Sequence, residues 1–167
     1  KVPFVNLGLQ YKSYRREIIN AFDSISLKGN YILGKDLIKF ERDFANFCGT
    51  RFAIGLGNGS DAITFSLMAL NISRGDEVII PANSFVATAW TVANTGAKIV
   101  FADVKNDLNI DPKSVEKLIN KNTKAIIPVH LTGKICEIDE IIKIAKKNKI
   151  HVIEDSAQSV GAKFKNK

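Results

Sequence analysis

The sequence predicts an α/β fold with a mostly parallel sheet. Short runs rich in valine and isoleucine recur from residue 51 onward, and their continuous apolar character is typical of strands buried on both faces. Between these runs lie segments whose apolar residues repeat roughly every three to four positions, as on one face of a helix. Strands and helices therefore alternate along the chain, which is the order expected of a parallel sheet with crossover helices.

The N-terminal region, 1–50, differs from the rest because it predicts helices before any strand. Two amphipathic helices are expected there, over 10–25 and 33–49. Phe40, Phe44 and Phe47 recur at helical spacing in the second helix, and we interpret them as a core stripe. We therefore treat this region as a helical segment that precedes the sheet.

The α/β part is expected to cover 51–167. Its strands are expected over 52–56, 77–82, 98–104, 124–131 and 150–156. The clearest helical patterns cover 60–72, 111–122 and 137–149. In the second of these helices, Asp111 is placed to cap the first turn, and Pro112 follows where a missing N–H costs nothing.

Composition bounds the class of protein. The 167 residues suffice for one domain with a sizeable core, and no apolar run reaches the ~18 residues of a membrane span, so we expect a cytoplasmic protein without a membrane partner. The net charge of +7 comes with lysines on predicted helix surfaces, which favours a solvated face over a nucleic-acid site. Cys48 and Cys136 lack metal-type spacing, so we expect free, buried thiols and no metal site.

Two expected strand ends lead into turns that suit a ligand, because open α/β sheets gather ligands at the carboxyl ends of their strands. The turn "GLGNGSDAI" opens a helix near Ser60, where unpaired N–H groups and the helix dipole favour a phosphate; an ordinary capped turn is the alternative. After the next strand, a loop presents Ser84 and Phe85. Phe85 would stack on a flat ligand or pack in the core.

Two further strand ends carry ionisable residues. His130 stands alone on an apolar run, and we interpret it as a hydrogen-bonded core residue rather than a base. An ionised Asp155 at a buried strand end requires a cation or strong donor, such as a protonated pyridine nitrogen. Ala157 is small enough to lie flat against a ring, and Gln158 offers an amide to a ring substituent. The alternative is a structural aspartate that caps the next turn.

Six segments together resemble the DegT/DnrJ/EryC1/StrS family of sugar aminotransferases, within the fold-type I pyridoxal-phosphate enzymes. They are, in order, "VPFVNLGLQY", "GNGSDAI", "EVIIPANSFVATA", "GAKIVFADV", "IIPVHLTGK" and "VIEDSAQSVGA". The resemblance implies a three-layer αβα large domain like that of aspartate aminotransferase, here incomplete. It also implies pyridoxal 5′-phosphate as the cofactor.

The resemblance further implies roles for the site residues. Asp155 would pair with the pyridine nitrogen and keep it protonated, so that the ring accepts electrons during transamination. Phe85 would stack on one face of the ring, Ala157 would lie against the other, and Gln158 would lie near the 3-hydroxyl group. The phosphate would be held by the backbone amides of Gly59, Ser60 and Asp61.

Family members transfer an amino group, usually from glutamate, to a keto group of a nucleotide-linked deoxysugar. Their products enter lipopolysaccharide, O-antigen, glycan or antibiotic pathways, and the enzymes form homodimers with composite active sites. The family's Schiff-base lysine follows the "EDSAQ" segment by a few tens of residues, so Lys163, Lys165 and Lys167 are too close to Asp155 to be that residue.

We therefore expect this chain to be the N-terminal part of a longer enzyme, without the C-terminal small domain and catalytically silent by itself. Two alternatives stay open. One is a sugar dehydratase of the same family that works without the lysine, and the other is a non-catalytic remnant.

Overall fold

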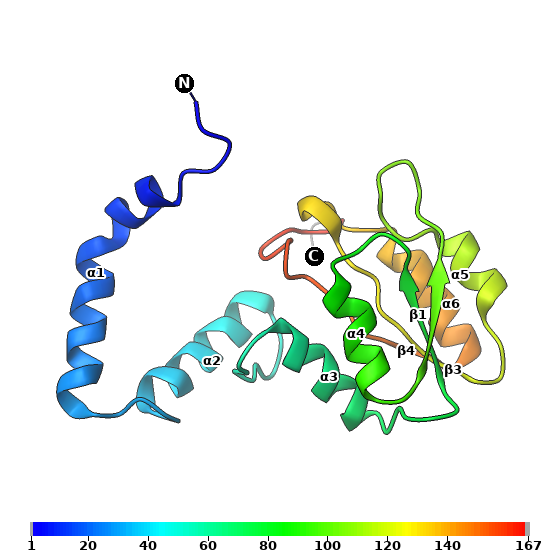
Figure 1. The fold of residues 1–167 in the computed structure, drawn as a ribbon, viewed down its shortest axis with the longest axis horizontal. Helices are drawn as coiled ribbons and strands as arrows, with labels where there is room; N and C mark the ends of the chain where they lie inside the picture. The colour runs from blue at the N-terminus through cyan, green and yellow to red at the C-terminus, as the bar shows by residue number, and fades with distance from the viewer. Residues whose placement is uncertain (1, 166–167) are drawn as a thin grey trace. The chain divides into compact units, whose positions relative to one another are not determined.

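The structure, a computed structural model, describes residues 2–165. Its course is shown in Figure 1, and the chain separates into two compact units, Lys1–Gly55 and Leu56–Lys167. The first unit contains α1 (Leu7–Lys28) and α2 (Lys35–Cys48), which confirms both helices expected near the N-terminus. The sheet and the remaining helices belong to the second unit.

The phenylalanine stripe of α2 is not a core stripe, so that expectation is wrong. Phe40 and Phe47 are 57% and 65% exposed. Phe44 lies between them, with its ring centroid 5.5 Å from that of Phe40 and 6.1 Å from that of Phe47. Within the described chain, Ala45 is the only buried residue of the two helices, because two helices without a sheet cannot enclose their apolar faces.

The strand expected over 52–56 does not form. Phe52 and Ile54 are exposed, and the segment crosses the boundary between the two units instead of pairing with a strand. A short apolar run alone does not make a strand, because the backbone also needs a neighbour for its hydrogen bonds.

Four parallel strands form the sheet of the second unit, in the order β2-β1-β3-β4. Their bounds are β1 (Glu77–Pro81), β2 (Lys98–Ala102), β3 (Thr123–Ile126) and β4 (His151–Val152). The four confirm the remaining strand predictions, although β3 and β4 are shorter than expected. Beyond them, one isolated parallel bridge joins Val129 to Asp155 and extends the pairing toward the carboxyl edge.

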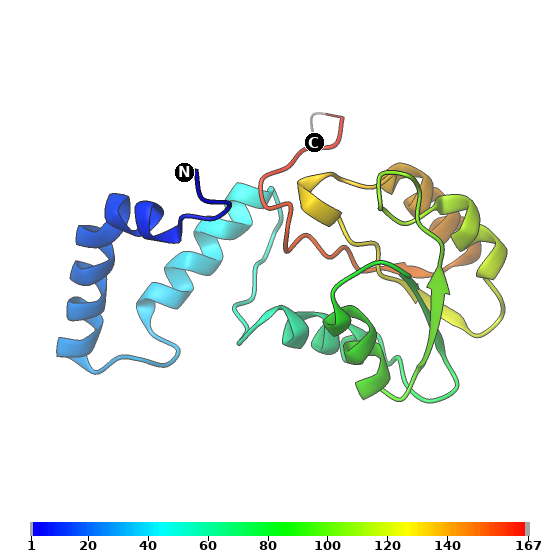
Figure 2. The ribbon, with the colours of Figure 1, turned by 45° about the horizontal axis from the view of Figure 1, so that its top comes forward.

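Helices cover both faces of this sheet, giving the expected αβα layers (Figure 2). The helices are α3 (Gly59–Ala69), α4 (Val86–Asn94), α5 (Pro112–Leu118) and α6 (Ile138–Asn148), with a 3-10 turn, η1 (Leu131–Gly133). On β1, Val78 and Ile80 pack in the core that includes α3 and α4, whereas Ile79 packs in the core that includes α5 and α6. The alternation follows from the two-residue period of a strand.

The capping prediction for α5 is confirmed. The Asp111 carboxylate accepts a hydrogen bond from the Lys113 N–H at 2.9 Å, and Pro112 is the first residue of the helix. The helix ends at Leu118 because Ile119 is extended, with φ −65° and ψ 131°. It is therefore shorter than the 111–122 pattern suggested.

The two thiols differ in their surroundings, so the expectation that both are buried is wrong for one of them. Both are free, but Cys48 is exposed at the end of α2, in the unit that lacks an enclosed core. Cys136 is buried in the core formed with α5 and α6, and burial raises the pKa of its thiol to about 12.

Candidate functional site

The topology of the sheet identifies the edge at which a ligand would bind. The chain leaves β1 for β2 on one side and then crosses to β3 on the other, so the connections diverge between β1 and β3. Ligands of open α/β sheets bind at the carboxyl ends of the strands beside such a switch. Seven predicted site residues follow a strand or begin a helix of the second unit: Gly59, Ser60, Asp61, Phe85, Asp155, Ala157 and Gln158.

The first turn of α3 offers two unpaired backbone donors. Asn58 caps the helix, since its Oδ1 accepts from the Asp61 N–H at 2.9 Å, while its Nδ2 donates to Asp61 Oδ2 at 3.0 Å. Across residues 2–165, the N–H groups of Gly59 and Ser60 have no protein acceptor. A Cβ at Gly59 would meet nothing within 4 Å. Two donors at an open helix N-terminus suit an anion, but the Asp61 amide is already used by the cap.

Asp155 is held by its backbone at the carboxyl edge. Its N–H donates to the Pro128 carbonyl at 2.9 Å, and its carbonyl accepts from the His130 N–H at 3.1 Å. Its carboxylate Oδ1 accepts from the Ala157 N–H at 3.1 Å, so Asp155 does cap the following turn. None of the ion pairs formed within residues 2–165 includes this half-buried carboxylate. The second oxygen therefore remains available to a cationic ligand atom.

Phe85 stands at the N-terminus of α4 rather than in the core. It is the N-cap residue of the helix, its backbone is extended, and its side chain is 72% exposed. The preceding Ser84 places its hydroxyl 2.8 Å from that of Thr88, which is buried in the first turns of the same helix. Within residues 2–165, Phe85 therefore does not pack in the core, and its ring is accessible to a flat ligand.

Gln158 is oriented by a backbone donor that the sequence did not reveal. Its Oε1 accepts from the Thr132 N–H at 2.7 Å, although both residues are exposed. Thr132 lies in η1 with φ 55°, a left-handed backbone conformation. The only sequence signal for this turn is Gly133 beside it, since glycine commonly marks such positions.

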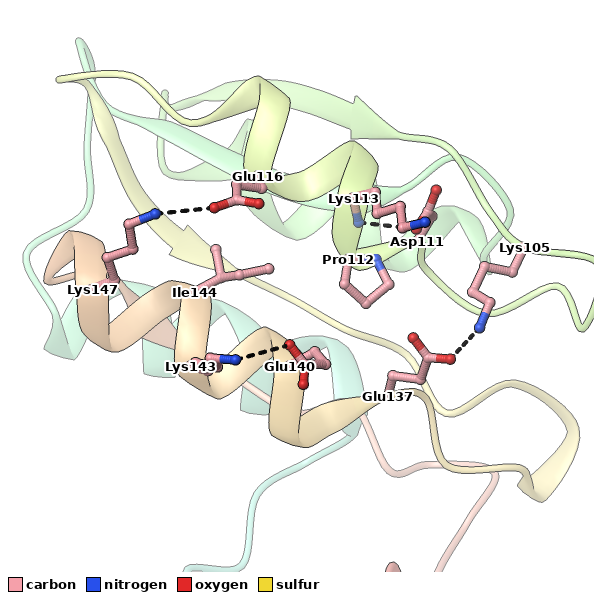
Figure 3. Close-up of a pocket in the computed structure, with 10 residues that line it drawn as sticks. All are labelled: Lys105, Asp111, Pro112, Lys113, Glu116, Glu137, Glu140, Lys143, Ile144 and Lys147. Atoms are coloured by element: carbon pink, nitrogen blue, oxygen red, sulfur yellow. Dashed lines mark hydrogen bonds and ion pairs between the residues drawn. The ribbon is translucent and has the colours of Figure 1, made fainter.

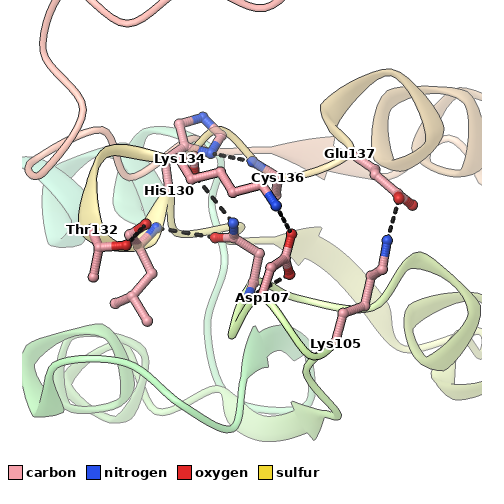
Figure 4. Close-up of polar contacts among 9 residues, drawn as sticks. Lys105, Asp107, His130, Thr132, Lys134, Cys136 and Glu137 are labelled. Atoms are coloured by element: carbon pink, nitrogen blue, oxygen red, sulfur yellow. Dashed lines mark hydrogen bonds and ion pairs between the residues drawn. The ribbon is translucent and has the colours of Figure 1, made fainter.

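His130 is a core residue, as expected. It is 2% exposed, and its Nδ1 accepts from the Cys136 N–H at 3.3 Å. Because Nδ1 is the acceptor, the proton of the neutral ring is on Nε2, which lies 3.0 Å from Glu154 Oε2. His130, Cys136 and the neighbouring Thr132 are shown in Figure 4. Both ring nitrogens are engaged by the protein, so nothing points to a catalytic base here.

A hollow of about 570 Å³ lies between α5 and α6 (Figure 3). Its charged groups pair across it: Lys105 contacts Glu137, and Lys147 lies 3.2 Å from Glu116. The hollow belongs to the outer helix layer and not to the strand ends. We therefore regard it as a charged helix surface and assign it no ligand.

No group of histidine, cysteine, aspartate and glutamate side chains in residues 2–165 is arranged to hold a metal ion. Within the same residues, none of the helices combines the length and hydropathy needed to cross a bilayer.

The parallel sheet, its two helix layers and the polar residues that follow its strands define part of the large domain of a pyridoxal-phosphate-type aminotransferase fold. A comparison with protein families makes the assignment specific. The model of the DegT/DnrJ/EryC1/StrS aminotransferase family matches residues 12–167, and the chain belongs to that family.

Individual relatives cover almost the whole chain. A pleiotropic regulatory protein of Geobacillus stearothermophilus is 44% identical over 99% of this chain and 45% of its own length. A dTDP-3-amino-3,6-dideoxy-α-D-galactopyranose transaminase of Aneurinibacillus thermoaerophilus is 41% identical over 99% of this chain and 46% of its own length. The crystal structure of NtdA from Bacillus subtilis, with the cofactor PMP bound, matches with a TM-score of 0.92 and 36% identity, over 96% of this chain and 38% of its own. The chain thus spans less than half the length of these relatives.

Proposed function

We propose that the protein to which these residues belong is a pyridoxal-phosphate-dependent aminotransferase. It would move an amino group from an amino acid, glutamate, to a keto-deoxy nucleotide sugar in the synthesis of cell-surface polysaccharides or glycans. Two observations support the proposal. Asp155 presents a carboxylate without a cation, and α3 presents amide donors without an acceptor within residues 2–165.

The donor set fits the cofactor. The unpaired N–H groups of Gly59 and Ser60 suit a phosphate at a helix N-terminus, and Asp155 suits a protonated pyridine nitrogen. The exposed ring of Phe85 is available for stacking, and Ala157 adds little bulk where a flat ring would lie. When bound, pyridoxal phosphate supplies an electron sink for a carbanion formed next to nitrogen.

The residues of this chain would bind and orient that ring. Asp155 would hold the proton on the pyridine nitrogen: the Ala157 N–H engages one carboxylate oxygen, and the other oxygen would meet the ligand. The backbone hydrogen bonds that join Asp155 to Pro128 and His130 fix its position along the neighbouring segment. Gly59 and Ser60 would anchor the phosphate end, so that the ring is held at two points.

A homodimer is part of the proposal. The first unit leaves apolar side chains of α1 exposed along a hollow of about 610 Å³, including Tyr11, Tyr14 and Ile18. Together with the exposed rings of α2, this surface suits cover by a second copy, because contiguous apolar patches of this kind mark interaction sites. Sedimentation of the whole protein as a monomer at micromolar concentration would oppose it.

The test is Asp155→Asn in the whole protein. The amide keeps the shape but cannot hold the pyridinium proton, so we expect roughly 100-fold slower conversion of glutamate to 2-oxoglutarate by the cofactor-loaded protein. Glu154→Gln is the matched control, because that carboxylate lies against His130 and not the site. Activity of Asp155→Asn within a few-fold of wild type would remove this role. Loss of water from the keto sugar without amine transfer would assign the protein to the dehydratases.

Phe85 has a separate test. Phe85→Ala should weaken retention of the cofactor by about 1 kcal/mol, the size of an aromatic contact beyond its buried area. Equilibrium dialysis measures this directly. An unchanged affinity would remove Phe85 from the site.

A further inference from the structure

We propose that Asn109, acting through the 131–134 turn, holds Gln158 so that its amide NH2 faces the ligand. Gln158 would then serve only as a hydrogen-bond donor, to an anionic oxygen on the cofactor ring. This inference rests on the proposed function. It concerns Asn109 as a positioning residue, which lies on the loop between β2 and α5, far from Gln158 in the sequence.

The orientation of Gln158 follows from its partner. A backbone N–H can only donate, so the side-chain atom 2.7 Å from the Thr132 nitrogen must be the carbonyl oxygen. This contact leaves the NH2 group at the other end of the amide. Without the Thr132 contact, the amide could flip and present either its oxygen or its NH2 group to a ligand.

Asn109 clamps the turn that carries Thr132. It is 2% exposed, and both ends of its amide are used on that turn: Oδ1 accepts from the Leu131 N–H at 3.0 Å, and Nδ2 donates to the Lys134 carbonyl at 3.1 Å. These two residues flank Thr132 on either side, and Lys134 N–H closes the turn on the Leu131 carbonyl at 3.1 Å. The left-handed backbone of Thr132 costs free energy, so an external clamp is needed to hold it.

Asn109 is itself rigid. Its N–H donates to Asp107 Oδ1 at 3.2 Å, and its carbonyl accepts from the Lys105 N–H at 2.9 Å. Lys134 Nζ lies 2.7 Å from Asp107 Oδ2, which ties the two loops together a second time. Figure 4 shows Asp107, Lys134 and Thr132 gathered in this network. A buried amide that uses both its oxygen and its NH2 group on one turn favours one arrangement of both loops.

The polarity matters because the oxygen on the ring of pyridoxal phosphate exists as an anion or as a hydroxyl. A fixed donor stabilises the anion and lowers the pKa of that oxygen, by about one pH unit for a hydrogen bond to a charged group. An amide that could turn would lower this pKa by less. The pKa of the bound cofactor, read from its visible absorption band, therefore reports the orientation of Gln158.

The test compares Asn109→Ala with Asn106→Ala in the whole protein loaded with pyridoxal phosphate. Asn106 lies in the same turn but is exposed and makes no side-chain hydrogen bond within residues 2–165, so it controls for the same truncation. We expect Asn109→Ala to raise the pKa of the absorption band by about one pH unit and Asn106→Ala to leave it unchanged. Gln158→Glu keeps an acceptor for Thr132 but loses the donor, and it should raise the pKa at least as much.

The double variant Asn109→Ala with Gln158→Glu identifies the route. If Asn109 acts through Gln158, the double variant matches Gln158→Glu alone; an additional shift would refute the coupling. Should Asn109→Ala not fold, hydrogen exchange decides: the Thr132 amide should be protected in the native protein and exposed in Gln158→Ala, and equal exchange in both would overturn the inference. Failure of the wild-type protein to bind the cofactor would instead defeat the proposed function, and this inference with it.

Discussion

Gly59→Pro removes one of the two unpaired amides of α3 while leaving the helix intact. Proline is well tolerated at the first position of a helix, where the N–H has no partner within the helix. Gly59 is that first residue, and a side chain there would meet nothing within 4 Å. Asn58 before it is extended, with φ −165° and ψ 173°, so it is already outside the α region that a following proline disfavours.

The two expected magnitudes have opposite signs. Stability should rise by roughly 0.5 to 1 kcal/mol, because proline restricts the unfolded chain and no native hydrogen bond is lost. Affinity for pyridoxal phosphate should fall, because a hydrogen bond to a charged group contributes about 1.5 to 3 kcal/mol. That loss corresponds to a dissociation constant about tenfold to hundredfold larger. A protein that is more stable and yet binds more weakly separates the site from the fold.

The assay compares pyridoxal phosphate with pyridoxal, which lacks the phosphate, by equilibrium dialysis. Gly59→Ala is the control, because it adds a methyl group into open space and retains the N–H. Only Gly59→Pro should weaken binding, and only for the phosphorylated ligand. Wild-type affinity of a folded Gly59→Pro variant would refute the role of this amide, and equal loss for both ligands would show that the variant blocks the site sterically.

Three further predictions concern stability and reactivity. The hydrogen bond from Lys98 at 2.8 Å is the main cause of the lowered pKa of Glu77. The ionised Glu77 therefore stabilises the fold above the ordinary pKa of 4.5, and this contribution is lost as the pH falls below that value. Glu77→Gln should lower the free energy of unfolding in urea by about 1 kcal/mol at pH 7, and the difference from wild type should disappear in acid. Leu67→Ala should cost about 2 to 5 kcal/mol in the same measurement, because that side chain is fully buried; a loss under 1 kcal/mol would contradict the packing. Iodoacetamide at pH 8 should label Cys48 in the native protein and Cys136 only after unfolding, as read by peptide mass spectrometry; native labelling of Cys136 would contradict its burial and raised pKa.

The sheet was predictable because its strands are short apolar runs buried on both faces. In β1 every residue is buried, so the continuous pattern in "EVIIP" could only belong to a central strand. The helix α6 was equally clear, with isoleucines buried on one side and lysines on the other. The core of the second unit could therefore be predicted from the local pattern of apolar residues.

The first unit was less predictable for a physical reason. Apolar periodicity shows which face of a helix seeks cover, but not whether the cover lies in the same chain. Phe40 and Phe47 have the pattern of a core stripe and remain exposed. The same limit explains 52–56, whose apolar residues find no neighbouring strand.

Some residues of the candidate site could be located from local sequence signals, and others could not. Asp155 and the helix N-terminus at Gly59 could be located from the sequence, because a strand end and a glycine-rich turn are local signals. Asn109 could not, because its role depends on two loops that meet only in the folded sheet. Nothing local to Asn109 distinguishes it from an ordinary turn residue.

Two polar side chains of the candidate site, Asp155 and Gln158, are held in the same way. In each, the fold engages one polar atom of the side chain and leaves the other without a side-chain hydrogen bond within residues 2–165. Asp155 has one carboxylate oxygen on the Ala157 N–H, and Gln158 has its carbonyl on the Thr132 N–H. The remaining oxygen and the remaining NH2 group thus have defined polarity before any ligand arrives. Since binding then orders few additional groups, its entropic cost is reduced, and a ligand with the wrong pattern of donors and acceptors meets fixed groups that cannot turn to suit it.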